Sequence, residues 1–143
     1  MTVVDTNIIA YLFIEGDRTS SCRKVMSEDP DWSVPFLWRS EFRSVLSLHM
    51  RKAGMTLAGA VSRSAEAEKL LAGREYSIDS STILSLTEKH PVSAYDAEFV
   101  CLADKLGTKL VTTDKSILKH FPYLAVSPEN FTLKGEQDSG GNA

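Results

Sequence analysis

Two aspartates occupy matching places in the chain, each after a short apolar run and before a stretch with helical spacing. Asp5 follows Val3-Val4, and Asp114 follows Leu110-Val111-Thr112-Thr113. In an open α/β sheet, ligands bind just beyond the carboxyl ends of the parallel strands, so both carboxylates are predicted to lie where such proteins carry out their chemistry. The alternative is that each aspartate only caps the following helix by accepting its free N–H groups.

Glu41 is a third acid in an unexpected place. It lies within a helix predicted over residues 36–52, and at about 100° per residue it falls on the same half of that helix as Leu37 and Val45. A carboxylate on a buried face costs several kcal/mol unless it is paired or binds a metal. Glu41 is therefore a candidate ligand, with a salt bridge to an arginine or to His49 as the alternative.

Asp96 and Glu98 are close together in a helix that begins at Ser93. Asp96 is the third residue of this helix, where the acid of a capping box would sit. It also lies beside the apolar arc that includes Phe99 and Leu102, so its side chain could instead point toward the sheet. Glu98 falls on the opposite flank of that arc, and we interpret it as a rim residue or an additional acid.

The four acids Asp5, Glu41, Asp96 and Asp114 would carry a charge of about −4 if they met at one sheet edge. Such a cluster is unstable without cations, because each neighbouring pair repels by about 4 kcal/mol at 4 Å and an effective dielectric constant near 20. Oxygen ligands of this kind select magnesium or manganese rather than zinc. The predicted chemistry is to hold one or two divalent ions over a phosphodiester and prepare a water for in-line attack.

The elements that must position these acids alternate along the chain. Short apolar or alternating stretches predict strands near residues 3–4, 32–34, 76–78, 109–113 and 124–126, with helical patterns between them. This order predicts an α/β fold, a three-layer sandwich with a central, mainly parallel sheet flanked by helices. The length of 143 residues fits one domain. We assign it to residues 1–133 and expect residues 134–143, which lack an apolar anchor, to be disordered.

The four acids and their neighbours resemble the motifs of PIN-domain nucleases, and in detail those of the VapC-type ribonuclease toxins of type II toxin–antitoxin pairs. The matching segments are Val4-Asp5-Thr6-Asn7, Trp38-Arg39-Ser40-Glu41-Phe42, Tyr95-Asp96-Ala97 and Leu110-Val111-Thr112-Thr113-Asp114. The resemblance covers about residues 1 to 130. Each motif is short, and the order and spacing of all four carry the resemblance.

The resemblance implies a divalent-metal-dependent endoribonuclease that uses Mg²⁺ or Mn²⁺. By this resemblance, the four acids bind the metal, and the residues that would hydrogen-bond them are Thr6, Asn7, Thr112 and Thr113. It also implies an RNA substrate, a cognate antitoxin protein that covers the active-site groove, and a homodimer. The role of Glu98 is left open by the motif match.

The net charge of −3 at first argues against a nucleic-acid partner. Without the four acids the charge is +1, and without residues 134–143 as well it is +2. Basic residues could then hold phosphates, with Arg39, Arg43 and Lys115 as the leading RNA-binding candidates; the others are Arg51, Lys52, Lys105, Lys109 and Lys119. No apolar run reaches the roughly 18 residues of a membrane span, and no export signal is visible, so we expect a cytoplasmic protein.

Two other functions are weighed against the nuclease. The same fold could be a non-catalytic binding or assembly module, in which the acids are only helix caps and salt-bridge partners. The chain could also be a phosphate-handling domain of the receiver or phosphatase kind. Those domains need a second acid beside the strand-one aspartate or two residues later, and here Thr6 and Asn7 occupy these positions.

Overall fold

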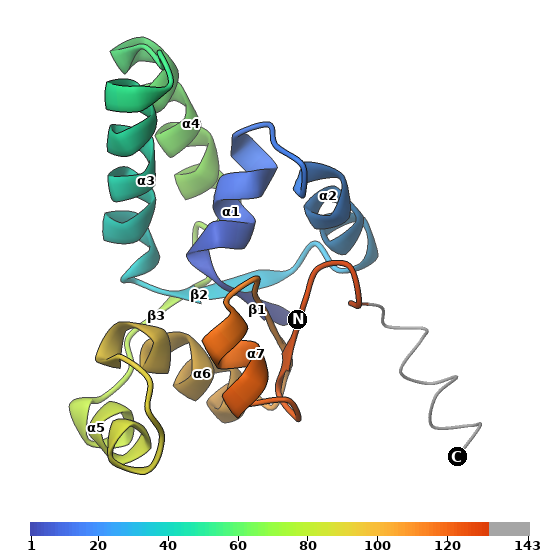
Figure 1. Cartoon of the computed structure of the whole chain (residues 1–143), viewed down its shortest axis with the longest axis vertical. Coiled ribbons are helices and arrows are strands. Elements are labelled where there is room, and N and C mark those ends of the chain that lie inside the picture. The colour runs from blue at the N-terminus through green and yellow to red at the C-terminus, as the bar shows by residue number, and fades with distance from the viewer. Residues whose placement is uncertain (132–143) are drawn as a thin grey trace.

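The computed structural model describes residues 1–131, and within this range the chain forms one five-stranded sheet with helices on both faces (Figure 1). Every neighbouring pair of strands is parallel, in the order β3-β2-β1-β4-β5. The strands are β1 (Thr2–Val4), β2 (Trp32–Pro35), β3 (Glu75–Tyr76), β4 (Leu110–Val111) and β5 (Ala125–Val126). The predicted three-layer α/β sandwich is confirmed. The tail predicted to be disordered, residues 134–143, lies outside the described residues.

The helices divide into two layers. Helices α1 to α4 lie over one face of the sheet, and α5 to α7 lie over the other (Figure 1). Their bounds are α1 (Thr6–Phe13), α2 (Thr19–Glu28), α3 (Trp38–Lys52), α4 (Leu57–Leu70), α5 (Ser80–Lys89), α6 (Ala94–Leu106) and α7 (Lys115–His120). No helix within residues 1–131 combines the length and the apolar character needed to cross a membrane.

The central strands are buried on both faces, which explains why their residues are almost all apolar. Val3, Val4, Leu110 and Val111 are completely inaccessible to solvent. Large side chains from both helical layers complete the core on either side of them: Trp38, Phe42, Phe99 and Phe121. This packing fixes the carboxyl ends of β1 and β4 relative to the helices that surround them.

The connections place a crevice at the carboxyl ends of β1 and β4. From β1 the chain passes to β2 on one side, and it later returns to β4 on the other side. The order of strands therefore reverses between β1 and β4, which is the position where open parallel sheets bind their ligands. Asp5 follows β1 directly, and Asp114 follows β4 after two threonines.

Helix α3 begins at Trp38, two residues after its predicted start at residue 36. The reason is a sheet contact, because the Phe36 N–H donates to the Tyr76 carbonyl at 3.0 Å and continues the pairing of β2 with β3. The later start leaves Glu41 in the first turn of α3, close to the end of the sheet.

Candidate active site

Asp5 is the most deeply buried of the four acids, with 7% of its surface exposed. One carboxylate oxygen, Oδ1, accepts the Thr6 N–H at 2.8 Å and caps α1. The other, Oδ2, accepts the Thr112 hydroxyl at 2.7 Å. The capping interpretation is therefore correct for one oxygen of Asp5, but it does not account for the second oxygen or for the acids nearby.

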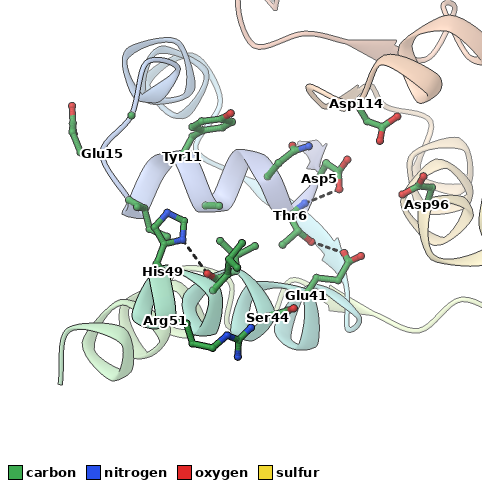
Figure 2. Close-up of a pocket in the computed structure, with 16 residues that line it drawn as sticks. Asp5, Thr6, Tyr11, Glu15, Glu41, Ser44, His49, Arg51, Asp96 and Asp114 are labelled. Atoms are coloured by element: carbon green, nitrogen blue, oxygen red, sulfur yellow. Dashed lines mark hydrogen bonds between the residues drawn. The ribbon is translucent and has the colours of Figure 1, made fainter. Parts of the chain in front are cut away.

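Glu41 points from the first turn of α3 toward α1 (Figure 2). Its Oε1 accepts the Thr6 hydroxyl at 2.7 Å. Thr6 therefore holds two acids, Asp5 through its backbone N–H and Glu41 through its hydroxyl. The alternative salt bridge to Glu41 is wrong for the described residues, among which no cation lies within ion-pair distance of it; the His49 ring instead contacts the Val45 carbonyl.

Asp96 faces the same region from the first turn of α6. The hydrogen bond at this helix start runs from the Asp96 N–H to the Ser93 hydroxyl oxygen at 3.0 Å. The Ser93 side chain also interacts with the Asp96 carboxylate by a hydrogen bond that acts to lower its pKa. The capping interpretation is therefore correct for the pairing of Asp96 with Ser93, but it does not account for the position of this carboxylate in the lining of the groove.

Asp114 is joined to Asp5 through Thr112. The Asp114 N–H donates to the Thr112 hydroxyl oxygen at 3.0 Å, and that hydroxyl in turn donates to Asp5. Oδ1 of Asp114 accepts the Ile117 N–H at 2.9 Å and caps α7. As for Asp5, one oxygen acts as a cap while the carboxylate also faces the crevice (Figure 2).

The structure brings all four predicted acids to the same groove, which has a volume of about 750 Å³. They occupy one end of it, and α1 and α3 form much of the remainder (Figure 2). The acids come from four separate segments of the chain: Asp5, Glu41, Asp96 and Asp114.

Burial and mutual repulsion change how these acids titrate. Burial raises the pKa of Asp5 to about 6, and the charges of Glu41 and Asp96 add to this effect. Burial also raises the pKa of Glu41, with contributions from Asp96 and Glu98. Burial and then the charge of Asp114 raise the pKa of Asp96. Carboxylates that raise one another's pKa favour a bound proton or a bound cation.

The chemistry of the donors fits a hard divalent cation. The candidate ligands are all carboxylate oxygens, as magnesium and manganese prefer. The buried Oδ1 of Asn7, on the adjoining turn of α1, is a further oxygen and has no hydrogen-bond partner among the described residues. Within residues 1–131, no three acid, histidine or cysteine side chains are yet close enough to hold one ion. The type and charge of these ligands therefore fit a divalent cation, while the acids lie farther apart than they would around a bound ion.

The other predicted residues beside the acids differ in their contacts. Thr6 and Thr112 donate to the acids as described, whereas no hydrogen bond within residues 1–131 joins the Thr113 side chain to them. Glu98 is half-buried, burial raises its pKa, and it does not line the groove. Its role stays a prediction.

The three leading RNA-binding candidates all lie outside the lining of the groove. The Arg39 guanidinium forms ion pairs with Glu68 and Glu75, and Glu75 also accepts the Trp38 indole N–H at 2.8 Å. This network ties α3 to α4 and β3. Arg43 lies on a different side of α3, beside α4, and Lys115 is an exposed residue at the start of α7.

Several residues that line the groove were not singled out from the sequence. Ala10 and Tyr11 on α1, and Ile14 at its C-cap, line it together with Asn7. Their spacing of three, four and seven residues from Asn7 puts them on one helical face. This spacing would have identified these residues from the sequence, because Asn7 follows Asp5 closely and marks the helical face next to the acids. Ser44 and Leu48 line the groove from α3 in the same way, three and seven residues after Glu41.

Residues 2–122 match the sequence profile of the PIN domain, which spans most of the chain. This chain belongs to the PIN-domain family. It is 30% identical over 126 residues to Ribonuclease VapC3 of Pyrobaculum aerophilum, and the match covers 85% of this chain and 95% of that protein. The predicted resemblance to VapC-type PIN domains is confirmed.

Two solved structures share the PIN fold of this chain at low sequence identity. One is a toxin–antitoxin complex from Klebsiella pneumoniae, with a TM-score of 0.65, 16% identity, and coverage of 90% of this chain and 98% of that chain. The other is FitAcB from Neisseria gonorrhoeae, with a TM-score of 0.68, 16% identity, and coverage of 92% of this chain and 100% of that chain.

Proposed function

We propose that this PIN-domain protein is a divalent-metal-dependent endoribonuclease that acts as the toxin of a toxin–antitoxin pair. The observation that carries the proposal is the convergence of four acids from four segments on one groove, with no cation from the described residues lying between them. Membership of the PIN family and the similarity to a ribonuclease of the VapC type support the assignment to RNA hydrolysis.

Each acid has a distinct part in this proposal. Asp5 is fixed at both oxygens by Thr6 and Thr112, so it is the rigid member of the cluster. Glu41 is held at one oxygen only. Asp96 lines the groove without an ion pair among the described residues, and a bound cation would draw its carboxylate toward the other acids.

A bound Mg²⁺ or Mn²⁺ would neutralise this charge and supply Lewis acidity at the phosphodiester. Asp5, Glu41, Asp96 and Asp114 are the residues that would hold it. The Thr6 and Thr112 hydroxyls orient two of these carboxylates, as hydrogen-bond donors outside a metal's own ligands commonly do. The acid end of the groove would otherwise repel a phosphate, so binding of RNA there depends on the cation.

The partners follow from the same proposal. RNA is the substrate, and an antitoxin protein is the inhibitor that occupies the groove in a cytoplasmic complex.

We also propose a homodimer, because apolar side chains are exposed along α3 and α4, where Leu57 is 66% and Val61 58% exposed. Light scattering should give twice the chain mass for the wild type and the single mass for Val61→Glu with an unchanged circular dichroism spectrum. A monomeric wild type would contradict the dimer.

The non-catalytic alternative rests on a specific observation, since Asp5 and Asp114 do cap α1 and α7. It leaves the position of Glu41 and Asp96 in the groove unexplained, because neither side chain forms an ion pair within residues 1–131. Two half-buried acids without a paired cation are costly in a binding module and useful in a cation site.

The test is cleavage of single-stranded RNA by the purified full chain with Mg²⁺ or Mn²⁺. We expect EDTA to abolish cleavage, and Glu41→Gln and Asp96→Asn to reduce it by about 100-fold or more, because each removes one charge from the cation site. Glu66→Gln, on an exposed face of α4, is the matched control and should cleave as the wild type does. Full activity of Glu41→Gln and Asp96→Asn, or full activity in EDTA, would contradict the proposal.

A further inference from the structure

The groove is much longer than its acidic end. From Glu41 to Arg51 it follows ten residues of α3, which is about 15 Å of helix. Along this length it is lined by α3 on one side, through Ser44, Val45 and Leu48, and by α1. A ligand that fills the groove must therefore extend well past a single phosphodiester held at the acids.

Arg51 is the only lysine or arginine among the described residues that line this groove. One of its N–H groups donates to the Ser47 hydroxyl oxygen at 2.9 Å, and no carboxylate of residues 1–131 lies within ion-pair distance of it. A guanidinium has five N–H donors in a planar fork that matches a phosphate. Most of the donors of Arg51 are therefore available to a ligand.

The ion pairs of two other arginines show how Arg51 differs from them. Arg39, on the same helix, is held by two carboxylates and serves the fold. The acid that lines the distal end, Glu15, is itself paired with Arg23 at 3.1 Å, which reduces its repulsion of a phosphate. The distal end of the groove thus presents one unpaired cation and no unpaired acid among its described residues.

The surface between the acids and Arg51 is largely apolar. Leu48 is 44% exposed although it is a large apolar residue. Tyr11 is half-buried on α1, next to Gly16, where an added Cβ would lie 3.6 Å from the ring. An apolar surface with an aromatic ring suits a nucleobase, and a cation beyond it suits the next phosphate of the strand.

We propose that the distal end of the groove is a subsite for the RNA strand, in which Arg51 binds a phosphate away from the cut and Leu48 and Tyr11 contact a base. This inference rests on the proposed ribonuclease function and names the residues that hold the substrate. The occupant of this subsite during catalysis is RNA, because the distal end is continuous with the acids where the strand would be cut, and the proposed antitoxin would compete with RNA for the same groove.

The experiment compares Arg51→Gln with Lys69→Gln, which loses the same charge from an exposed site on α4 outside the groove. Cleavage of an RNA of about ten nucleotides and of a dinucleotide is measured with Mn²⁺ from 50 to 300 mM KCl. For the longer RNA we expect Arg51→Gln to raise KM about tenfold with kcat within twofold, because a charged hydrogen bond is lost. The dependence of log KM on log salt should fall in slope by about 0.7, the value for one lost single-strand phosphate contact.

Three results separate a binding role from a structural one. Lys69→Gln should match the wild type, Arg51→Lys should restore part of the affinity, and Arg51→Gln should not affect the dinucleotide, which is too short to reach Arg51. An unchanged KM and salt slope in Arg51→Gln, with an active wild type, would overturn the subsite and leave the proposed function intact.

A measurement of RNA binding, without cleavage, distinguishes failure of the subsite from failure of the proposed ribonuclease function. If the wild type cuts no RNA with either metal, the proposed function fails. Fluorescence anisotropy of the labelled ten-nucleotide RNA then still tests the subsite, with the same change in salt slope expected for Arg51→Gln. Equal RNA affinities and equal salt slopes for Arg51→Gln and the wild type would overturn it.

Discussion

Two buried aspartates lie at opposite ends of β1 and have nearly the same hydrogen bonds, yet their pKa values move in opposite directions. Asp29, at the amino end, is 6% exposed and accepts the Thr2 hydroxyl at 2.6 Å and the Asp31 N–H at 3.0 Å. Asp5, at the carboxyl end, is 7% exposed and also accepts one threonine hydroxyl and one backbone N–H.

The neighbouring charges explain the difference. Burial acts to raise the pKa of Asp29, but the hydrogen bonds from Thr2 and from the terminal ammonium, 2.9 Å away, outweigh burial and lower the pKa. Burial, together with the charges of Glu41 and Asp96, raises the pKa of Asp5 to about 6, because these neighbours are acids and do not offset the cost of burial. Asp29 is paired with a cation of the chain itself, the terminal ammonium. Asp5 has acids as its charged neighbours, as expected for a residue that binds a cation from solution.

The largest expected difference between these two acids is in catalysis. Asp5→Asn should reduce metal-dependent RNA cleavage by about 1000-fold or more, because the rigid member of the cation site loses its charge. Asp29→Asn removes the same charge beside the opposite end of β1 and should keep cleavage within about twofold of the wild type at 20 °C. Initial rates measured on one RNA give this comparison. Equal loss in both variants would mean that Asp5 acts only through folding.

Stability without metal should distinguish the two acids next. Asp5 has a folded-state pKa near 6 and an unfolded pKa near 3.8, so the folded state binds more protons between these values. The free energy of unfolding should therefore fall as the pH rises from about 4 to about 6, by about 3 kcal/mol for this group alone, and stay level above that.

The measurement is urea denaturation in EDTA at pH 5 and pH 7.5. Asp5→Asn should be more stable than the wild type at pH 7.5, by up to about 3 kcal/mol, and this advantage should shrink at pH 5. An Asp5→Asn chain that is less stable than the wild type at pH 7.5 would show that its hydrogen bonds matter more than its repulsion.

Asp29 should behave in the opposite way. Asp29→Ala should lower the free energy of unfolding by about 2 kcal/mol at pH 7, because it leaves the Thr2 hydroxyl and the terminal ammonium without their acceptor. Since the pKa of Asp29 is lowered, this contribution is present above about pH 4 and is lost as the pH falls further. A stability difference from the wild type that does not decrease below pH 4 would contradict the ion pair.

The smallest expected change in stability concerns Asp114, which both caps α7 and faces the groove. Asp114→Ala should lose about 1 kcal/mol of stability with the cap, whereas Asp114→Asn can still accept the Ile117 N–H and should lose little. Both variants should lose cleavage, because both remove the charge. Thermal melts and cleavage rates of the pair separate the two roles, and an active Asp114→Asn would restrict Asp114 to capping.

The sequence was informative where the signal is local. Asp5 and Asp114 were predicted at strand ends because an apolar run followed by an acid and a helical pattern can be recognised within ten residues. Glu41 was noticed because it breaks the apolar side of a regular helix. The parallel α/β sandwich follows from the alternation of the two patterns, and it is confirmed.

The sequence was uninformative where a contact joins distant segments. Arg39 was a candidate for binding RNA because it lies on the polar side of α3, but its partners Glu68 and Glu75 come from α4 and β3. Asp29 was not singled out, since its partner is the chain terminus, brought near by the pairing of β1 with β2. For Asp96, the sequence could not tell whether the residue pairs with the N-cap or faces the sheet edge, and the structure shows that it does both.

The most direct test of the central claim is a crystal of the full chain soaked in MnCl₂, with anomalous scattering measured at the manganese edge. We predict one or two peaks within about 2.5 Å of carboxylate oxygens of Asp5 and at least two of Glu41, Asp96 and Asp114. A wild-type crystal with millimolar manganese and no peak in this groove would contradict the account, as would manganese bound only elsewhere on the chain.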